Sequence, residues 1–318
     1  MNILIYGFGR MGLTHFTILN GLNSEIDFTI IEPNKFLRSL LKTNFDKVTF
    51  YKDDSSLYKA FDITLITTPP FIHLELLKKS INRGDKKIFV EKPFGGYTNT
   101  IKDPLFNSKN LYIGYVLRYN PCIQWAKSNI LTKDILSIKG QFLSNTLEKK
   151  PVGWRNGHFS GVLNEVGSHV IDLIQYILGT SSMDVQSANK QSVISDVDDI
   201  LDAELKTDTN VTVSLHFNWV KKEIRKPIFS LEILMKDGTK YFLDQQQVLF
   251  YNDIGKNIDK ISVTDISESV PFYLRGIDFT KQMEDLLDDC SVMANVNDGL
   301  GVNKIIKKIL NYEDNSRR

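Results

Sequence analysis

The sequence predicts an α/β protein of two domains, a doubly wound parallel sheet followed by an α+β domain with a large, mostly antiparallel sheet. Three observations support this prediction. Short apolar runs alternate with helix-compatible stretches up to about residue 119, and a glycine-rich turn follows the first run. Beyond that point the apolar runs lengthen and alternate apolar with polar residues, as in sheets with one buried face.

The length and composition fit a soluble protein of two domains, which we place at residues 1–119 and 120–318. The net charge is +1 without a dense block of Lys or Arg, so we expect neither a nucleic-acid nor a membrane partner. Cys122 and Cys290 lie far apart and suggest no disulfide framework or zinc site, so no metal is expected. The first apolar run is too short for a signal peptide or a membrane span, which predicts a cytoplasmic protein.

The glycine-rich turn, Gly7-Phe8-Gly9-Arg10-Met11-Gly12, lies between the apolar run Ile3–Tyr6 and a helix-compatible stretch. The first glycine allows a sharp turn, the second lets the backbone approach a pyrophosphate, and the third lets the helix lie against the strand. The free N–H groups and positive dipole end of that helix would face the phosphates. We predict a dinucleotide site of the Rossmann type formed by these six residues. A structural turn and a methyltransferase loop are the alternatives.

Glu32 closes the next apolar strand, Asp27–Ile31. A carboxylate at this place hydrogen-bonds the ribose hydroxyls of the adenosine and repels a 2′-phosphate. The cofactor expected from these residues is NAD, with NADP less favoured.

Two further strands of the first domain end in candidate cofactor residues. The run Asp62–Thr67 breaks at Thr68-Pro69, shortly before His73, and the run Lys87–Val90 ends in Glu91-Lys92-Pro93. The carboxyl ends of parallel strands meet at one edge of the sheet, where ligands bind. We therefore expect cofactor contacts from these strand ends: Thr68, Pro69, His73, Glu91 and Lys92.

Lys92 is also a candidate for chemistry. Pro93 restricts it to extended geometry, which would hold the ammonium group over the crevice. There it could hydrogen-bond a substrate hydroxyl or donate to a carbonyl. The alternative is a solvated surface lysine, but the position at a strand end favours the functional interpretation.

A second candidate lies in residues 160–179, where Glu165, His169 and Asp172 have helical spacing and fall in one row. A histidine can take or give a proton near neutral pH, and a carboxylate one turn earlier can fix its tautomer. We predict proton transfer here, with a Glu–His pair on a wet surface as the alternative. The remaining histidines are interpreted as structural or solvent-facing: His15, His158 and His216.

The second domain is indicated by longer strand patterns. The run Val211–Trp219 alternates apolar and polar residues strictly, which is typical of an antiparallel sheet with one buried face. Two helices are expected to close the chain, over residues 271–290 and 298–310. The other strand candidates are residues 135–143, 185–194, 203–207, 229–235, 240–243 and 248–251.

These motifs resemble the Gfo/Idh/MocA family, the group of glucose–fructose oxidoreductase and inositol dehydrogenase. The resemblance runs through most of the chain. It implies a Rossmann domain, an active site between the two domains, and a homodimer or homotetramer formed through the open face of the second sheet. Besides Gly7–Gly12 it rests on Thr67–His73, Glu91–Pro93, Gly114–Pro121, Trp154-Arg155, Gly161–Asp172 and Asp298–Leu300.

The resemblance also implies residue roles. It carries the general acid/base role onto His169 and the role of the family's strand-end lysine onto Lys92. Glu165 takes the place of an acid that is more often aspartate in the family. Lys92 and four further residues are expected to contact substrate: Arg118, Tyr119, Arg155 and Asp172.

The resulting hypothesis is an NAD-dependent dehydrogenase acting on a secondary alcohol of a sugar, an inositol or a nucleotide sugar. The nicotinamide would accept a hydride from the carbinol carbon, while His169 takes the hydroxyl proton, aided by Lys92 and oriented by Glu165. Two alternatives stay open. One is a cofactor-binding regulator without turnover, and the other is a reductase of an imine or a linear tetrapyrrole on the same scaffold.

Overall fold

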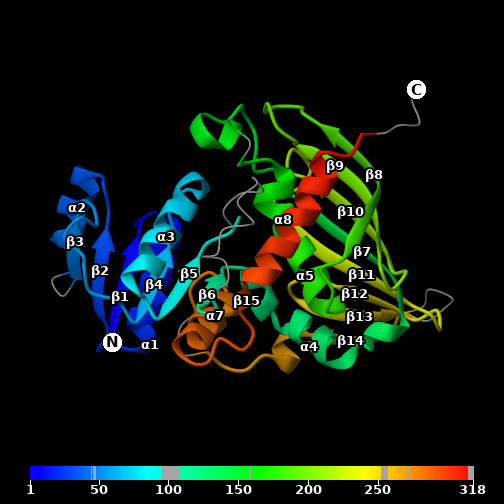
Figure 1. Ribbon diagram of the computed structural model, residues 1–318. Helices are drawn as coiled ribbons and strands as arrows, with labels where there is room; N and C mark the ends of the chain where they lie inside the picture. The colour runs from blue at the N-terminus through cyan, green and yellow to red at the C-terminus, as the bar shows by residue number, and fades with distance from the viewer. Residues whose placement is uncertain are drawn as a thin grey trace. The chain divides into compact units, whose positions relative to one another are not determined.

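The computed structural model describes residues 1–43, 45, 48–94, 108–157, 159–251, 257–270 and 273–313. The prediction for His158 falls outside these residues. The chain divides into two compact units (Figure 1). The first contains residues 1–116 and 269–299, and the second contains residues 117–268 and 300–318.

The first unit is built on a parallel sheet of order β6-β5-β4-β1-β2-β3, with β15 added antiparallel beside β6. This order confirms the predicted Rossmann-type sheet. Its inner strands are buried because helices pack on the sheet, with α1 against β1 and α3 against β4 and β5. The strands are β1 (Asn2–Tyr6), β2 (Asp27–Ile31), β3 (Val48–Tyr51), β4 (Ile63–Ile66), β5 (Lys87–Val90), β6 (Leu111–Ile113) and β15 (Ala294–Asn295). The helices are α1 (Arg10–Leu22), α2 (Lys35–Lys42), α3 (His73–Arg83) and α7 (Ile277–Leu287).

Residues 269–299 return to the first unit, whereas the sequence suggested a single division at residue 119. Two contacts hold this returning segment. Helix α7 packs against α1, and the two-residue strand β15 pairs with β6. A strand of two residues has no periodicity that a sequence could reveal.

The second unit is built on a sheet of order β14-β13-β12-β11-β7-β10-β9-β8. All its neighbouring strands are antiparallel except β7 and β10, which run parallel at its centre. This confirms the predicted large, mostly antiparallel sheet. The strands are β7 (Ile135–Leu143), β8 (Met183–Gln191), β9 (Ile200–Thr207), β10 (Thr212–Asn218), β11 (Ile228–Met235), β12 (Lys240–Leu243), β13 (Gln247–Tyr251) and β14 (Asn257–Ser262). The helices are α4 (Pro121–Asn129), α5 (Ser168–Leu178), α6 (Val263–Ile266) and α8 (Val296–Leu310), of which α8 has its first four residues in the first unit.

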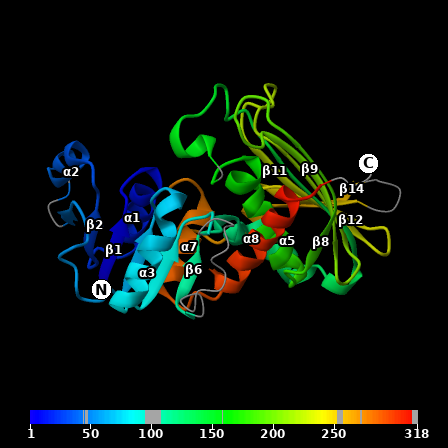
Figure 2. The ribbon, with the colours of Figure 1, turned by 45° about the horizontal axis from the view of Figure 1, so that its top comes forward.

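Helices α5 and α8 lie along one face of this second sheet (Figure 2). Gly140 in β7 allows the close approach of α5, because a Cβ at this position would lie 2.5 Å from Cγ1 of Val170. The other face is polar, as the strict alternation of buried and exposed residues along β9 shows. Among the described residues, no helix is both long and apolar enough to cross a membrane.

Candidate active site

The glycine-rich turn has the geometry that its three glycines predict. Gly7 adopts φ +83°, a conformation that side chains disfavour. A Cβ on Gly12 would lie 2.1 Å from the carbonyl oxygen of Gly7, so only glycine lets α1 approach the end of β1 this closely. A Cβ on Gly9, by contrast, would meet no atom within 4 Å. Open space therefore lies over the Gly9 backbone, where a pyrophosphate would approach.

The N-terminus of α1 fits an anionic ligand. No side chain caps it, and its first turn contains no acidic residue. The backbone N–H groups of a helix start and the positive end of its dipole then attract phosphate oxygens. The side chain of Phe8 packs edge-on against Phe16, Phe45 and Phe50 in the core, so only its backbone is placed to meet a ligand.

Glu32 stands at the end of β2, beside the glycine turn. Its Oε2 accepts a hydrogen bond from the N–H of Phe8 at 3.1 Å, and its Oε1 accepts one from the N–H of Asn34 at 2.9 Å. These two bonds tie the carboxylate to the glycine turn and fix where it stands. The position is the one from which an acid hydrogen-bonds the adenosine ribose.

His73 is the first residue of α3 and contacts the segments that follow two strands. It is fully buried, with Nε2 2.7 Å from the carbonyl oxygen of Thr68 and Nδ1 3.2 Å from that of Pro93. Burial lowers the pKa of His73. Any contribution of His73 to the cofactor crevice therefore acts through the loops it ties together, which begin at Thr68-Pro69 and at Glu91.

Lys92 follows β5 and is half-buried, and its peptide bond to Pro93 is cis. The preceding residue, Glu91, is buried, and its Oε1 lies 2.6 Å from Nε2 of His15 in α1. His15 thus has a structural role, as expected, although its partner belongs to one of the predicted motifs. The first unit therefore brings together the glycine turn, Glu32 and the strand end that carries Lys92.

The second unit carries the other half of the predicted site, and its helix differs from the predicted one. Residues Leu163–Gly167 form a π-helical turn, and the α-helix α5 begins only at Ser168. Glu165 lies in this π-helical turn, where it accepts a hydrogen bond from Oγ of Ser160 and lies 4.0 Å from the guanidinium of Arg155. His169 is half-buried in the first turn of α5.

Arg118 and Asp172, both expected to contact substrate, form a buried ion pair with each other. Nε and Nη2 of Arg118 donate to the two carboxylate oxygens of Asp172 at 2.8 and 2.6 Å. Asp172 has no exposed surface and Arg118 is 4% exposed, and the neighbouring Tyr119 is buried as well. This pair joins the segment before α4 to α5. Of the four residues expected to contact substrate besides Lys92, only Arg155 is open to solvent, with 56% of its side chain exposed.

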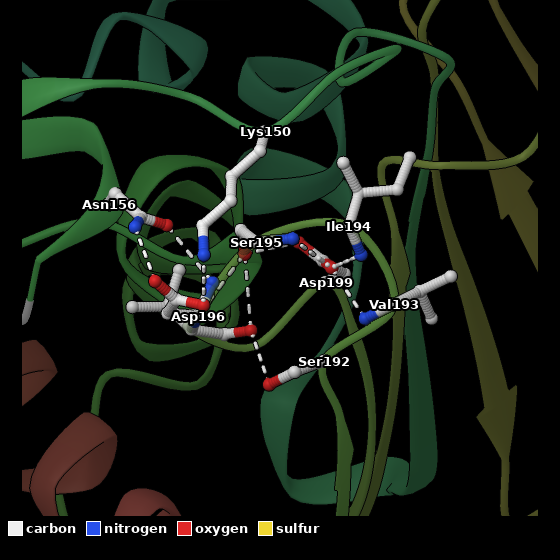
Figure 3. Close-up of polar contacts among 9 residues, drawn as sticks. Lys150, Asn156, Ser192, Val193, Ile194, Ser195, Asp196 and Asp199 are labelled. Carbon is white, nitrogen blue, oxygen red and sulfur yellow. Dashed lines mark hydrogen bonds and ion pairs between the residues drawn. The ribbon is translucent and has the colours of Figure 1, made fainter.

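Two aspartates three residues apart, Asp196 and Asp199, hold a loop near the start of this helix. Asp199 accepts hydrogen bonds from the N–H groups of Val193, Ile194 and Ser195 (Figure 3). It also accepts one from Nε1 of Trp219. Asp196 of the same loop binds the side chains of Lys150 and Asn156 (Figure 3). The loop thereby fixes the segment that carries Arg155. The sequence contained no signal for the contacts of Asp196, because its two partners lie 46 and 40 residues away.

Two family models match the chain. The model of an oxidoreductase family with an NAD-binding Rossmann fold matches residues 1–103. The model of the GFO/IDH/MocA C-terminal domain matches residues 134–239. Together the two matches span more than half of the sequence. A comparison with curated proteins finds no match.

Solved structures share the two-domain fold. An oxidoreductase domain protein from Kribbella flavida is 17% identical, with a TM-score of 0.82 over 97% of this chain and 95% of its own. Levoglucosan dehydrogenase in complex with NADH is 19% identical, with a TM-score of 0.82 over 98% and 96%. The UDP-N-acetylglucosamine 3-dehydrogenase of Acidithiobacillus ferrooxidans is 15% identical, with a TM-score of 0.74 over 98% and 96%.

Proposed function

The chain belongs to the GFO/IDH/MocA family of NAD-binding oxidoreductases, and on this premise we propose that it oxidises a secondary alcohol, or reduces the matching ketone, of a sugar, an inositol or a nucleotide sugar. The observation that carries the proposal is the position of Lys92. It follows β5 in the unit that holds the glycine turn and Glu32. Two proteins with the same fold are dehydrogenases of levoglucosan and of UDP-N-acetylglucosamine, which supports a carbohydrate substrate.

Each residue has one task in this proposal. Bound NAD supplies the hydride acceptor or donor, and the protein supplies orientation and proton transfer. His169 takes the proton of the substrate hydroxyl, and in the reverse direction it returns that proton to the alkoxide. Lys92 donates a hydrogen bond to the same oxygen and stabilises its negative charge. Glu165, held by Ser160, orients the imidazole.

The test has two stages. Fluorescence titration with NADH and NADPH measures cofactor binding without any substrate. The enzyme with NAD is then mixed with a panel of sugars, inositols and nucleotide sugars, and the formation of NADH is followed by absorbance. We expect tight NADH binding and turnover of at least one polyol.

Variants assign the roles once a substrate is found. His169→Asn and Lys92→Met should each lower kcat about 10²- to 10⁴-fold. His169→Asn should also leave the Kd of NADH nearly unchanged. Lys86→Met is the matched control for Lys92→Met, since Lys86 is exposed just before β5 and pairs there with Asp62. Full turnover by His169→Asn would remove His169 from the mechanism.

Two outcomes would support the alternatives instead. NADH binding without turnover on the whole panel would favour a cofactor-binding regulator. Turnover of an imine or a linear tetrapyrrole, with none of the polyols, would favour the other reductase.

We further propose that copies of the chain associate through the polar face of the second sheet. This face carries a hollow of about 670 Å³ whose lining includes Lys139, Asp202 and His216. Light scattering coupled to gel filtration gives the mass in solution. A dimer or tetramer that Asp202→Lys dissociates would support the proposal, and a monomeric wild-type protein would exclude it.

A further inference from the structure

Arg275 lies beside the glycine turn although the two are far apart in sequence. It precedes α7, and its Nη1 lies 3.3 Å from Sδ of Met11, in the first turn of α1. Its guanidinium also stands over the ring of Phe279, 5.2 Å from the centroid. Both segments belong to the first unit, and α7 packs against α1. The guanidinium is therefore held at the end of α1 where the phosphates of a dinucleotide are expected.

The backbone at Arg275 is unusual for an arginine. Its φ is +63°, and the following residue, Gly276, has φ +123°. Non-glycine residues rarely adopt such angles, because they cost free energy, and they persist where the surrounding structure enforces them. The turn thus presents this side chain to the glycine turn at an energetic cost to the fold.

Positive charge predominates around Arg275. Burial lowers the pKa of Arg275, and the positive charge of Arg10 lowers it further, while Glu91 opposes both effects. Glu91 already shares a short hydrogen bond with His15. Within the described part of the chain, Arg275 forms no ion pair. Two guanidinium groups therefore stand near the positive end of the α1 dipole, which favours the binding of an anion there.

We propose that Arg275 binds the pyrophosphate of the dinucleotide beside Met11 of the glycine turn, together with Arg10 and the uncapped start of α1. A guanidinium is suited to this task, because its planar fork donates two parallel hydrogen bonds to phosphate oxygens. Binding of the anion would also relieve the repulsion between the two arginines. The inference rests on the NAD-binding domain and is independent of the substrate proposed above.

The experiment compares Arg275→Gln with Lys86→Gln by NADH fluorescence titration. Both variants lose one positive charge in the first unit, but Lys86 immediately precedes β5, at the amino edge of the sheet, and pairs there with Asp62. Loss of a charged hydrogen bond should weaken NADH binding about 10- to 100-fold in Arg275→Gln. Lys86→Gln should bind NADH like the wild type. Arg275→Lys should lie between them, because it keeps the charge and loses the fork.

Competition against NADH locates the contact on the cofactor. ADP-ribose and inorganic pyrophosphate contain the proposed contact, and adenosine lacks it. In Arg275→Gln the affinities of ADP-ribose and pyrophosphate should fall by the same factor as that of NADH, while adenosine is unaffected. Unchanged NADH binding, or an equal loss for adenosine, would overturn the proposal. Urea unfolding of both variants shows whether a loss of binding is merely a loss of fold.

Discussion

His15 in α1 and Glu91 after β5 share a buried hydrogen bond, with 2.6 Å between Nε2 and Oε1. The imidazole has no exposed surface and lies against the rings of Phe89 and Phe279. Nδ1 has no hydrogen-bond partner among the described residues, which fits a ring that carries its hydrogen on Nε2. One bond thus joins the helix of the glycine turn to the residue that precedes Lys92.

Replacing His15 tests how much this bond stabilises the unit. His15→Leu leaves the carboxylate of Glu91 buried without its donor and should lower the free energy of unfolding by about 1–3 kcal/mol. His15→Gln should lose less, because its amide N–H can still donate to Glu91. Urea unfolding followed by far-UV circular dichroism, which reports on both units, measures both losses. Equal losses would mean that ring packing, rather than the hydrogen bond, accounts for the effect.

Gly9 and Gly12 allow stability to be separated from cofactor binding. Gly12→Ala places a methyl group 2.1 Å from the carbonyl oxygen of Gly7, so α1 must move away from β1. We expect a loss of at least about 2 kcal/mol of unfolding free energy, measured by urea denaturation. Gly9→Ala has open space for its methyl group and should leave stability within about 0.5 kcal/mol of the wild type.

Gly9→Ala should weaken cofactor binding although it leaves stability unchanged. In Gly9→Ala the methyl group occupies the space over the backbone that the pyrophosphate needs, so NADH titration should show at least about tenfold weaker binding in a fully folded protein. Normal NADH affinity in Gly9→Ala would show that the cofactor does not approach the backbone at this glycine.

Local patterns predicted much of the fold. The bounds of β2, β5, β7 and β12 agree with the expected strands because apolar periodicity and turn residues act over a few positions. The glycine turn was predictable for the same reason, since its strand, its turn and its helix start are contiguous. The π-helical turn before Ser168 was not, because helical spacing alone does not distinguish it from an α-helix.

Long-range pairing could not be read from the sequence. Arg118 and Asp172 were expected to meet substrate, yet they neutralise each other across 54 positions. Arg275 lies 264 positions from Met11, and its approach depends on how α7 packs on α1. In each case the tertiary fold determines which group a charged side chain contacts, and the spacing of the residues along the chain does not reveal that group.

Glu32 is expected to set the preference between the two dinucleotides. Its carboxylate repels the 2′-phosphate of NADPH, so Glu32→Gln should narrow the ratio of NADPH to NADH dissociation constants by about tenfold. The glutamine oxygen can still accept one of the bonds from Phe8 and Asn34. Glu25→Gln is the control, since Glu25 is exposed in the turn before β2. A ratio that stays the same in both variants would assign the discrimination to other residues.

Asp198 and Asp199 are neighbours with opposite shifts of pKa. Burial raises the pKa of Asp198 from 3.8 to about 6, although it accepts a hydrogen bond from the N–H of Leu163 at 2.7 Å. Burial would also raise the pKa of Asp199, but hydrogen bonds from Ser195, Ile194 and Trp219 outweigh it and lower that pKa. The first carboxyl group therefore binds a proton more tightly in the folded protein than in the unfolded chain, and the second more weakly.

The sign of the pH dependence follows from linkage. The contribution of Asp198 to stability is fully present below pH 3.8 and is lost as the pH rises through about 6. Asp198→Asn removes this term and keeps an oxygen that can accept from Leu163. Between pH 4 and pH 7 the unfolding free energy of the wild type should therefore fall relative to the variant by about 2 kcal/mol.

Urea unfolding at closely spaced pH values measures this difference. Asp199→Asn is the comparison, because the stability that Asp199 contributes is present above pH 3.8 and is lost only as the pH falls below it. Its unfolding free energy, plotted against pH, should run parallel to that of the wild type from pH 5 to pH 7 and lie below it. If the stability curves of wild type and Asp198→Asn also ran parallel over this range, the carboxyl group of Asp198 would not take up a proton there. Its burial would then be compensated by another group, and Lys190, whose positive charge lowers the pKa of Asp198, is a candidate.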